Sequence, residues 1–160
     1  MRNLKFRYSL FSFLGLLAFV SLEAPVLASY TEQNKEFFIN EIEYLWKDDK
    51  PGYSIFMKRV DSRLPEYEMT FRDSAKDLEV HWPMIAGISY KESHWNPKAI
   101  SKTGVRGMMM LTQKTAKEMG IKKRTNPEAS ILGGANYFQK TMDRLPDEIH
   151  KLYRILIALA

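Results

Sequence analysis

Glu92 is the acidic residue whose position best suits catalysis. At 100° per residue, Ile85, Ile88 and Glu92 share one narrow sector of a helix expected from Pro83 to about Ser93. A carboxyl on the buried face of a helix is desolvated, which favours its protonated form and raises its pKa. Such a group suits a general acid that cleaves a glycosidic bond near neutral pH. On spacing alone a plainer alternative is favoured, in which Glu92 lies in the last helical turn and reaches solvent past Ile88.

The composition limits the other chemistry that the chain can support. Its 160 residues include no cysteine, which excludes disulfide scaffolds, thiolate zinc sites and cysteine nucleophiles. With 45% apolar and 27% charged residues, the chain is expected to form one packed domain. The three histidines are His81, His94 and His150. They lack the i, i+4 spacing and the neighbouring acidic residues that a metal site needs, so we expect no metal and no cofactor.

Residues 1–28 have the pattern of a secretory signal peptide. Arg2, Lys5 and Arg7 precede an apolar run over residues 10–20, and small residues occupy the positions before a cleavage site expected after Ala28. A permanent membrane anchor is the weaker alternative, because the run is about half as long as a membrane-spanning helix. We therefore expect export to the periplasm.

The charge balance bears on the partner. Cleavage after Ala28 removes three cations and Glu23, so the net charge falls from +5 to +3. A mildly basic exported protein suits an anionic partner such as a cell-wall polymer or lipid headgroups. Nucleic acid is not expected, because no clustered stripe of Lys and Arg is present.

Helical patterns dominate the remaining chain. We expect residues 29–69 to form a helical N-terminal segment, in which residues 48–52 break the first helix. Residues 53–80, which extend beyond this segment, are expected to form one or two helices around Pro65. Asn96-Pro97 is expected to stop the helix that carries Glu92. Thr112 should cap a helix that Gly120 ends.

The next helix is expected to open at Asn126-Pro127-Glu128, where cap, proline and acid follow in the favoured order. Gly133-Gly134 should allow a neighbouring backbone to approach closely. The predicted inner face of this helix consists of Ile131, Leu132, Ala135, Phe138 and Met142. A last apolar helix over residues 152–159 runs to Ala160 without a capping glycine, so we expect the domain to be C-terminally incomplete.

Several motifs follow one another in an order that resembles a known catalytic domain. They are Glu92-Ser93 at a helix end, His94-Trp95-Asn96-Pro97, the stretch from Ser101 through Gly107 to Met108-Met109-Met110-Leu111-Thr112, Asn126-Pro127-Glu128, and Gly133-Gly134 with Tyr137. This order resembles the catalytic domain of soluble-type lytic murein transglycosylases, and in particular the C-terminal domain of the membrane-bound lytic murein transglycosylase F group. The resemblance covers residues 70–160.

The resemblance implies a mainly α, goose-lysozyme-like fold with a groove for peptidoglycan glycan strands. It also implies non-hydrolytic cleavage between N-acetylmuramic acid and N-acetylglucosamine, which leaves a 1,6-anhydromuramoyl end. Glu92 would act first as acid and then as base, without a second catalytic carboxylate. Ser101 would bind near the reacting sugar, and the remaining residues assigned to substrate are Gly107, Met108, Met109, Met110 and Tyr137.

Structural explanations remain open for several of these residues. At least one of the three methionines should be a core residue, because methionine commonly fills cores. Tyr137 is equally suited to packing or to the groove. Lys122-Lys123-Arg124 is most simply a solvated turn, and attraction to the peptide-stem carboxylates of peptidoglycan is the weaker alternative.

Two departures from the transglycosylase F pattern leave a second hypothesis. The large domain that precedes the catalytic domain in that group is absent from this sequence, and the sequence ends before the Ala-Tyr-Asn segment that follows the last helix in the family. The alternative to an active enzyme is therefore a catalytically inactive fragment that at most binds glycan strands. Peripheral association with the outer membrane stays open.

Overall fold

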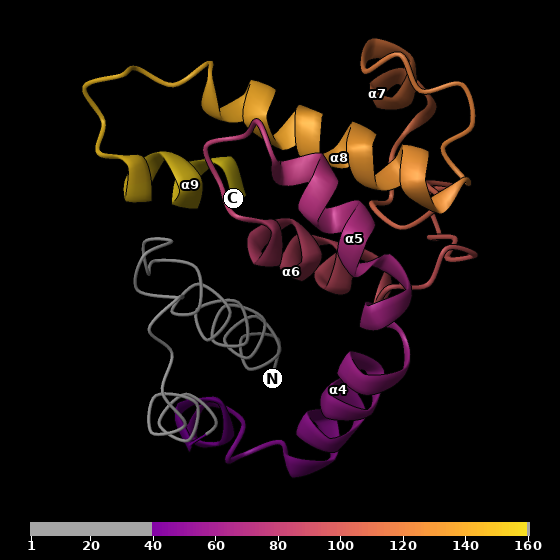
Figure 1. Cartoon of the computed structure of the whole chain (residues 1–160), viewed down its shortest axis with the longest axis vertical. Helices are drawn as coiled ribbons and strands as arrows, with labels where there is room; N and C mark the ends of the chain where they lie inside the picture. Colours follow the sequence, from indigo (N-terminus) through magenta and orange to yellow (C-terminus); the bar gives the residue numbers. More distant parts are fainter. Residues whose placement is uncertain (1–39, 160) are drawn as a thin grey trace. The chain divides into compact units, whose positions relative to one another are not determined.

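The computed structural model describes residues 40–159, in two compact units that divide between Glu66 and Tyr67. The predicted signal peptide over residues 1–28 and the start of the helical segment at residue 29 lie outside the described residues. Figure 1 shows the helices of both units in the colours of the sequence.

The first unit contains a short helical stretch over residues 40–45 and helix α4 (Lys50–Ser62). Asp49 caps α4, because its Oδ1 accepts a hydrogen bond from the Gly52 amide at 3.0 Å. Across the turn, the Trp46 and Phe56 rings stack with centroids 5.8 Å apart. The helical stretch thus ends at Leu45, before the predicted break at residues 48–52, and α4 begins inside that break, since a capping aspartate and an early proline also start helices.

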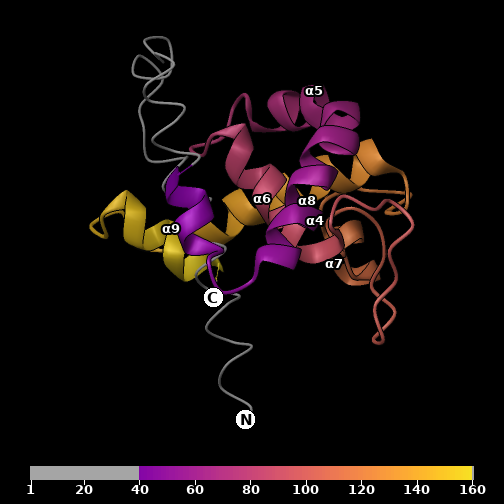
Figure 2. The same cartoon turned by 90° about the horizontal axis from the view of Figure 1, so that it is seen from below.

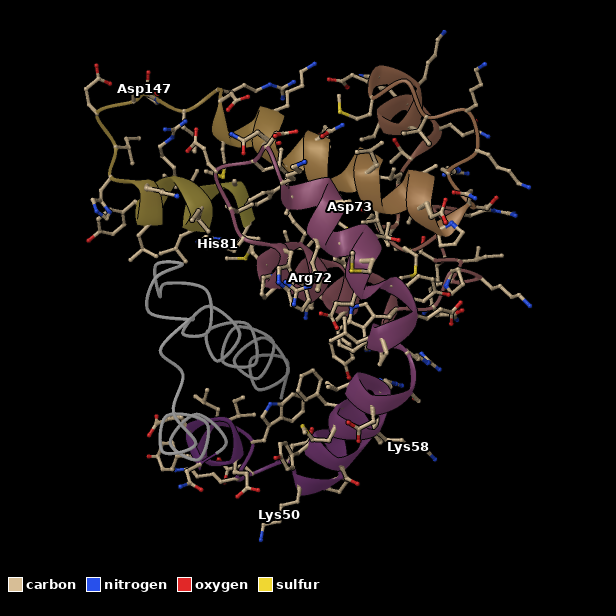
Figure 3. The ribbon with its side chains drawn as sticks, in the orientation of Figure 1. Lys50, Lys58, Arg72, Asp73, His81 and Asp147 are labelled. Carbon is tan, nitrogen blue, oxygen red and sulfur yellow. The ribbon has the colours of Figure 1, made fainter. Side chains whose placement is uncertain are left out.

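Helix α5 (Leu64–Ala75) follows after Arg63, with Pro65 in its first turn. Residues 53–80 thus hold two helices separated just before the proline. Within the second unit, Tyr67 and Phe71 of α5 are buried. Arg72, labelled in Figure 3, pairs with Glu68 at 2.7 Å and lies 4.5 Å from the centre of the Trp82 ring.

The second unit is built around helix α8 (Pro127–Met142), which contacts α6 (Trp82–Ser93), α7 (Gln113–Glu118) and α9 (Lys151–Leu159). Helix α7 lies near the N-terminal end of α8 and α9 near its C-terminal end, as Figures 1 and 2 show. Residues 40–159 contain no strand, only two isolated bridges that join Arg106 to Ile100 and to Leu111. The prediction of a mainly α fold is confirmed.

The predicted start of α8 is confirmed, since Asn126 Oδ1 accepts from the Ala129 amide at 2.8 Å and Pro127 and Glu128 follow in the first turn. Most of the predicted inner face is buried, but Leu132 is 46% exposed, so its assignment was wrong. Leu132 lies about 100° around the helix from Ile131, outside the buried sector.

Neighbouring atoms do come close at Gly133-Gly134, but they belong to side chains and not to the backbone that was expected there. A Cβ atom at Gly133 would lie 2.6 Å from Ile121 Cγ1, and one at Gly134 would lie 2.6 Å from Met109 Cβ and Cγ. Real Cβ atoms do not come so near other carbons, because packed interiors leave no such overlap. The two glycines therefore allow the segments on both sides of α7 to reach the α8 backbone.

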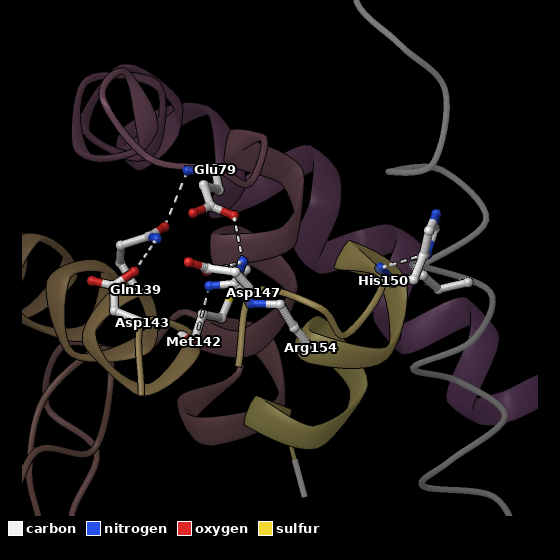
Figure 4. Close-up of polar contacts among 8 residues, drawn as sticks. Glu79, Gln139, Met142, Asp143, Asp147, His150 and Arg154 are labelled. Atoms are coloured by element: carbon white, nitrogen blue, oxygen red, sulfur yellow. Dashed lines mark hydrogen bonds and ion pairs between the residues drawn. The ribbon is translucent and has the colours of Figure 1, made fainter. Parts of the chain in front are cut away.

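Helix α9 is attached to α8 through the buried Arg154, which is 8% exposed (Figure 4). Its Nη2 donates to the Met142 carbonyl at 3.2 Å, and its Nη1 lies 3.4 Å from Asp147 and 3.9 Å from Glu79. Ile155 is buried beside it, while the next apolar residues of α9, among them Leu156 and Ile157, are exposed. The side of α9 that carries Arg154 and Ile155 thus packs against the rest of the second unit, including α8.

No helix within residues 40–159 is both long enough and apolar enough to cross a membrane.

Replacing Gly134 by alanine should destabilise the protein by about 1–3 kcal/mol, because the new methyl group overlaps the Met109 side chain and forces repacking. Urea unfolding at pH 7 measures this. Asn136→Ala is the matched control on the exposed side of α8 and should change stability by no more than about 0.5 kcal/mol. Equal stability of the Gly134 variant and wild type would contradict the packing described.

Candidate active site

Glu92 lies in the last turn of α6 and its side chain is exposed. The prediction that it projects from the buried face of the helix was wrong, and the alternative of a glutamate that reaches solvent past Ile88 describes its position. The physical reason is that α6 buries a different sector, formed by Ile85, Ser89 and Ser93 at intervals of four residues. Ile88 is half-buried at the edge of that sector, and Glu92 lies beyond it.

The buried serines of α6 hold a single peptide group of the following loop. Ser89 Oγ donates to the Met108 carbonyl at 3.1 Å, and Ser93 Oγ donates to the same carbonyl at 2.9 Å. On the other side of that peptide, the Met109 amide donates to Ser130 Oγ on α8 at 3.1 Å. The 108–109 peptide is therefore fixed to both helices, and one of its anchors is the residue after Glu92.

Left-handed backbone follows Glu92 directly. His94 and Trp95 have φ values of 54° and 56°, and His94 ends α6 as its C-cap. Trp95 is buried and its Nε1 donates to the Ala86 carbonyl at 2.8 Å, which turns the chain back along α6. The helix thus ends before Asn96-Pro97, which was expected to stop it. Such φ values are unfavourable for residues other than glycine and commonly occur at functional sites.

The surroundings of Glu92 favour its protonated form. Desolvation by neighbouring protein atoms raises the pKa of the Glu92 carboxyl above its ordinary value, and the Lys91 ammonium offsets part of that rise. Because the side chain also reaches solvent, this is a carboxyl at the rim of the protein and not in its core. A substrate that covered it would desolvate it further, which would raise the pKa in the same direction.

Ser101 organises the tip of the loop between α6 and α7, which Figure 2 shows projecting beside α7. Its Oγ accepts from the Thr103 amide at 3.2 Å and from the Val105 amide at 3.3 Å. Its backbone amide donates to the Val105 carbonyl at 3.1 Å. The predicted substrate-binding serine is therefore also the residue that closes this turn.

Gly107 begins the return of the loop toward the core. It has φ 88°, and a Cβ atom there would collide with the Arg124 carbonyl oxygen. The Arg124 guanidinium in turn donates to the carbonyls of Leu111 and Gly104. Arg124, in the turn before α8, thus holds the loop by two hydrogen bonds and leaves no room for a side chain at Gly107.

The three methionines that the sequence analysis assigned to substrate are divided between core and surface. Met108 is 0% exposed and Met109 6% exposed, so both side chains are part of the core. Met110 is half-buried with a left-handed φ of 46°. Tyr137 is exposed on α8. The sequence-based alternative that at least one methionine packs in the core is confirmed for two of them.

The later carboxylates of the second unit are exposed and lie in turns or near helix ends; they are Glu118, Glu128, Asp143, Asp147 and Glu148. A hydrogen bond from Lys140 lowers the pKa of Glu118, with smaller effects of the Lys140, Arg144 and Lys114 charges. Within residues 40–159, no three His or acidic side chains gather closely enough to hold a metal ion.

Comparison with known proteins identifies the family of this chain. The model of the transglycosylase SLT domain matches residues 69–159, which is more than half of the chain and includes Glu92, the loop and α8. The chain belongs to the transglycosylase SLT domain family. The predicted resemblance is thereby confirmed.

Curated relatives of this SLT domain are named membrane-bound lytic murein transglycosylase F. The protein of Saccharophagus degradans is 49% identical over 117 residues, which are 73% of this chain and 23% of the relative. The protein of Hahella chejuensis is 43% identical over 82% of this chain and 25% of its own length, and that of Yersinia pestis is 41% identical over 88% and 29%. The chain thus spans less than a third of the length of these relatives.

The sequence analysis missed the residues that hydrogen-bond to the loop between α6 and α7 and hold it in place. They are Ser89, Ser130 and Arg124. The serines at 89 and 93 were visible as small polar residues four apart, a spacing that places them on one helix face. Arg124 was assigned to a solvated turn with its two lysine neighbours, and nothing in the local sequence distinguishes it from them.

Replacing Ser130 by alanine should destabilise the protein by about 1–3 kcal/mol, because the buried Met109 amide then has no acceptor. Urea unfolding measures the loss. Ser74→Ala is the matched control, because Ser74 is also buried but only donates to a carbonyl of its own helix; a change well under about 1 kcal/mol is expected. Equal effects of the two variants would contradict the role given to Ser130.

The raised pKa of Glu92 predicts how pH changes stability. Between the unfolded and the folded pKa, the folded protein binds more protons at Glu92, so this contribution to stability is present at low pH and lost as pH rises. Glu92→Gln should therefore gain stability relative to wild type between pH 4 and pH 7, as measured by urea unfolding.

Glu118→Gln is the control of opposite sign. The lowered pKa of Glu118 contributes stability that is present above its unfolded pKa and lost as pH falls through its folded pKa, so Glu118→Gln should be less stable than wild type at pH 7, and this difference should shrink as pH falls to 4 and below. If the free energies of unfolding of Glu92→Gln and wild type differ by the same amount at pH 4 and at pH 7, the raised pKa of Glu92 is contradicted.

Proposed function

We propose that this chain is a peptidoglycan lytic transglycosylase, which cleaves the bond between N-acetylmuramic acid and N-acetylglucosamine and leaves a 1,6-anhydromuramoyl end. Membership of the SLT domain family supports the reaction class. One observation carries the assignment of the site. Glu92 is exposed at the end of α6 and has a raised pKa, and the next residue, Ser93, is hydrogen-bonded to the loop that is proposed to hold the substrate.

Glu92 is proposed as the general acid and then the general base. Its protonated carboxyl gives a proton to the glycosidic oxygen as the bond from that oxygen to C1 of the muramic acid breaks. The resulting carboxylate takes the proton of the C6 hydroxyl while that oxygen bonds to C1. The proton lost in the first step is regained in the second, and no water is consumed.

The loop residues are proposed to hold the sugar. Among the residues predicted to bind substrate, Ser101 and Met110 of the loop are half-buried, and Tyr137 is exposed on α8. Gly107, Met108 and Met109 are proposed to act through the loop backbone, because their positions are buried. A preorganised backbone next to the acid positions substrate without a loss of entropy at the moment of reaction.

We further propose that the protein acts in the periplasm after export, with peptidoglycan strands as its partner. The signal-like residues 1–28 and the net charge of +3 that remains after their removal support this location and an anionic partner. The relatives carry the words membrane-bound in their names, which is consistent with peripheral association with the outer membrane.

Glu92→Gln should abolish the release of anhydromuropeptides from purified sacculi, with a loss of at least about 10²-fold in rate, because the amide keeps the shape but cannot donate a proton. Mass spectrometry of the released muropeptides is the measurement, since it separates anhydro ends from hydrated ends. Binding to sacculi should be retained.

Glu148→Gln is the matched control, because Glu148 is exposed and lies in the connection between α8 and α9. It should release anhydro ends at the wild-type rate. Wild-type protein that releases none, together with an identical Glu92 variant, would reject the enzymatic proposal; hydrated ends alone would show a hydrolase.

A further inference from the structure

A cavity of about 550 Å³ lies in the second unit, against α7 and the turn after it. Ala116 and Ile121 supply apolar surface, and Gln113, Lys117, Lys122 and Arg124 supply polar groups. Its volume is in the range of cavities that hold small ligands. It differs from the proposed glycan site, because neither Glu92 nor any residue of the 101–111 loop lines it.

Arg124 gives this cavity a cation that is already fixed in position. The side chain is half-buried, and hydrogen bonds to the Leu111 and Gly104 carbonyls use two of its five N–H groups. A guanidinium held in this way loses little freedom when it binds an anion, and its planar donors match a carboxylate.

The charge around the cavity is not balanced locally. Lys117, Lys122 and Arg124 make no ion pair within residues 40–159, and no acidic residue lines the cavity. The acid of α7 itself, Glu118, is already paired with Lys140 at 2.9 Å and with Arg144 at 3.5 Å. An anion that entered the cavity would therefore meet three cations without displacing an internal partner.

We propose that this cavity binds a carboxylate of the peptide branch that peptidoglycan strands carry, an inference that rests on the proposed function. Arg124 connects the two places physically, since the same guanidinium lines the cavity and holds the substrate loop. A strand whose sugars lie along the loop would place its short acidic branches within reach of this neighbouring surface. The cavity would then favour peptide-bearing strands over bare glycan.

The shape of the site favours a peptide branch over a lipid surface. The cations line a hollow whose apolar residues, Ala116 and Ile121, are buried or half-buried. Attachment to a membrane surface instead uses protruding aromatic or aliphatic side chains beside the cations. Of the residues that line this cavity, none is aromatic.

The test compares two ligands and two double variants of the full chain. The ligands are a disaccharide that carries its peptide stem and the same disaccharide after enzymatic removal of the peptide. Lys117→Gln with Lys122→Gln removes two cations from the cavity but leaves Arg124 in place to hold the loop. Lys76→Gln with Lys151→Gln removes the same charge from exposed positions elsewhere.

Titrations followed by NMR should show shifts of the Gly120, Ile121 and Lys122 amides with the peptide-bearing ligand only. The Lys117/Lys122 variant should bind that ligand about five-fold more weakly, while the Lys76/Lys151 variant binds it as wild type does. Raising the salt concentration should reduce the five-fold difference, because screening weakens interactions between exposed charges.

Shifts confined to other residues, or equal affinity of the two double variants, would overturn the inference. Vesicles of anionic phospholipid provide a third ligand, and loss of vesicle binding with unchanged peptide binding would assign the cavity to lipid instead. The release of sugar products with 1,6-anhydromuramoyl ends is measured separately on peptide-free glycan. If that release occurs but the cavity variants bind normally, the proposed function stands and the cavity inference fails; if peptide binds in the cavity but no glycan is cleaved, the proposed function fails.

Discussion

The hydrogen bonds to the peptide group between Met108 and Met109 are the interaction on which the rest of the second unit depends. Two hydroxyls of α6 donate to its carbonyl and one hydroxyl of α8 accepts from its amide. A buried peptide group without partners would cost about as much as several ordinary hydrogen bonds contribute. The loop that carries it can therefore occupy one place only, between the two helices.

This constraint explains why the candidate acid is exposed and yet well placed. Serines leave space for the loop to approach α6 closely, so the helix buries the serine face and turns the neighbouring residue, Glu92, outward. The glycines of α8 have the same effect on the other side, where Met109 and Ile121 reach its backbone. A rim carboxyl on a rigid helix end can meet a large polymer, which a fully buried carboxyl could not do.

Local signals predicted much of this fold. Asn126-Pro127 and Thr112 begin helices where their capping chemistry indicates, and Gly133-Gly134 marks the close approach. Periodicity failed where it chose the wrong sector of a helix, because α6 buries the face of its serines and not that of Glu92, and Leu132 lies outside the buried face of α8. It also could not identify Arg124, because its role depends on carbonyls that lie 13 and 20 residues away in the sequence. Motif order located the site, but which motif side chains face the solvent is decided by tertiary hydrogen bonds.

The order of the anchors along the chain has a consequence for assembly. Glu92, Ser89 and Ser93 come first, the loop follows, and Arg124 and Ser130 come more than thirty residues after Glu92. A growing chain that has reached only Gly120 contains Glu92 and the loop but not the groups that fix the loop from the other side. The loop can therefore be fixed from both sides only once the chain extends to Ser130.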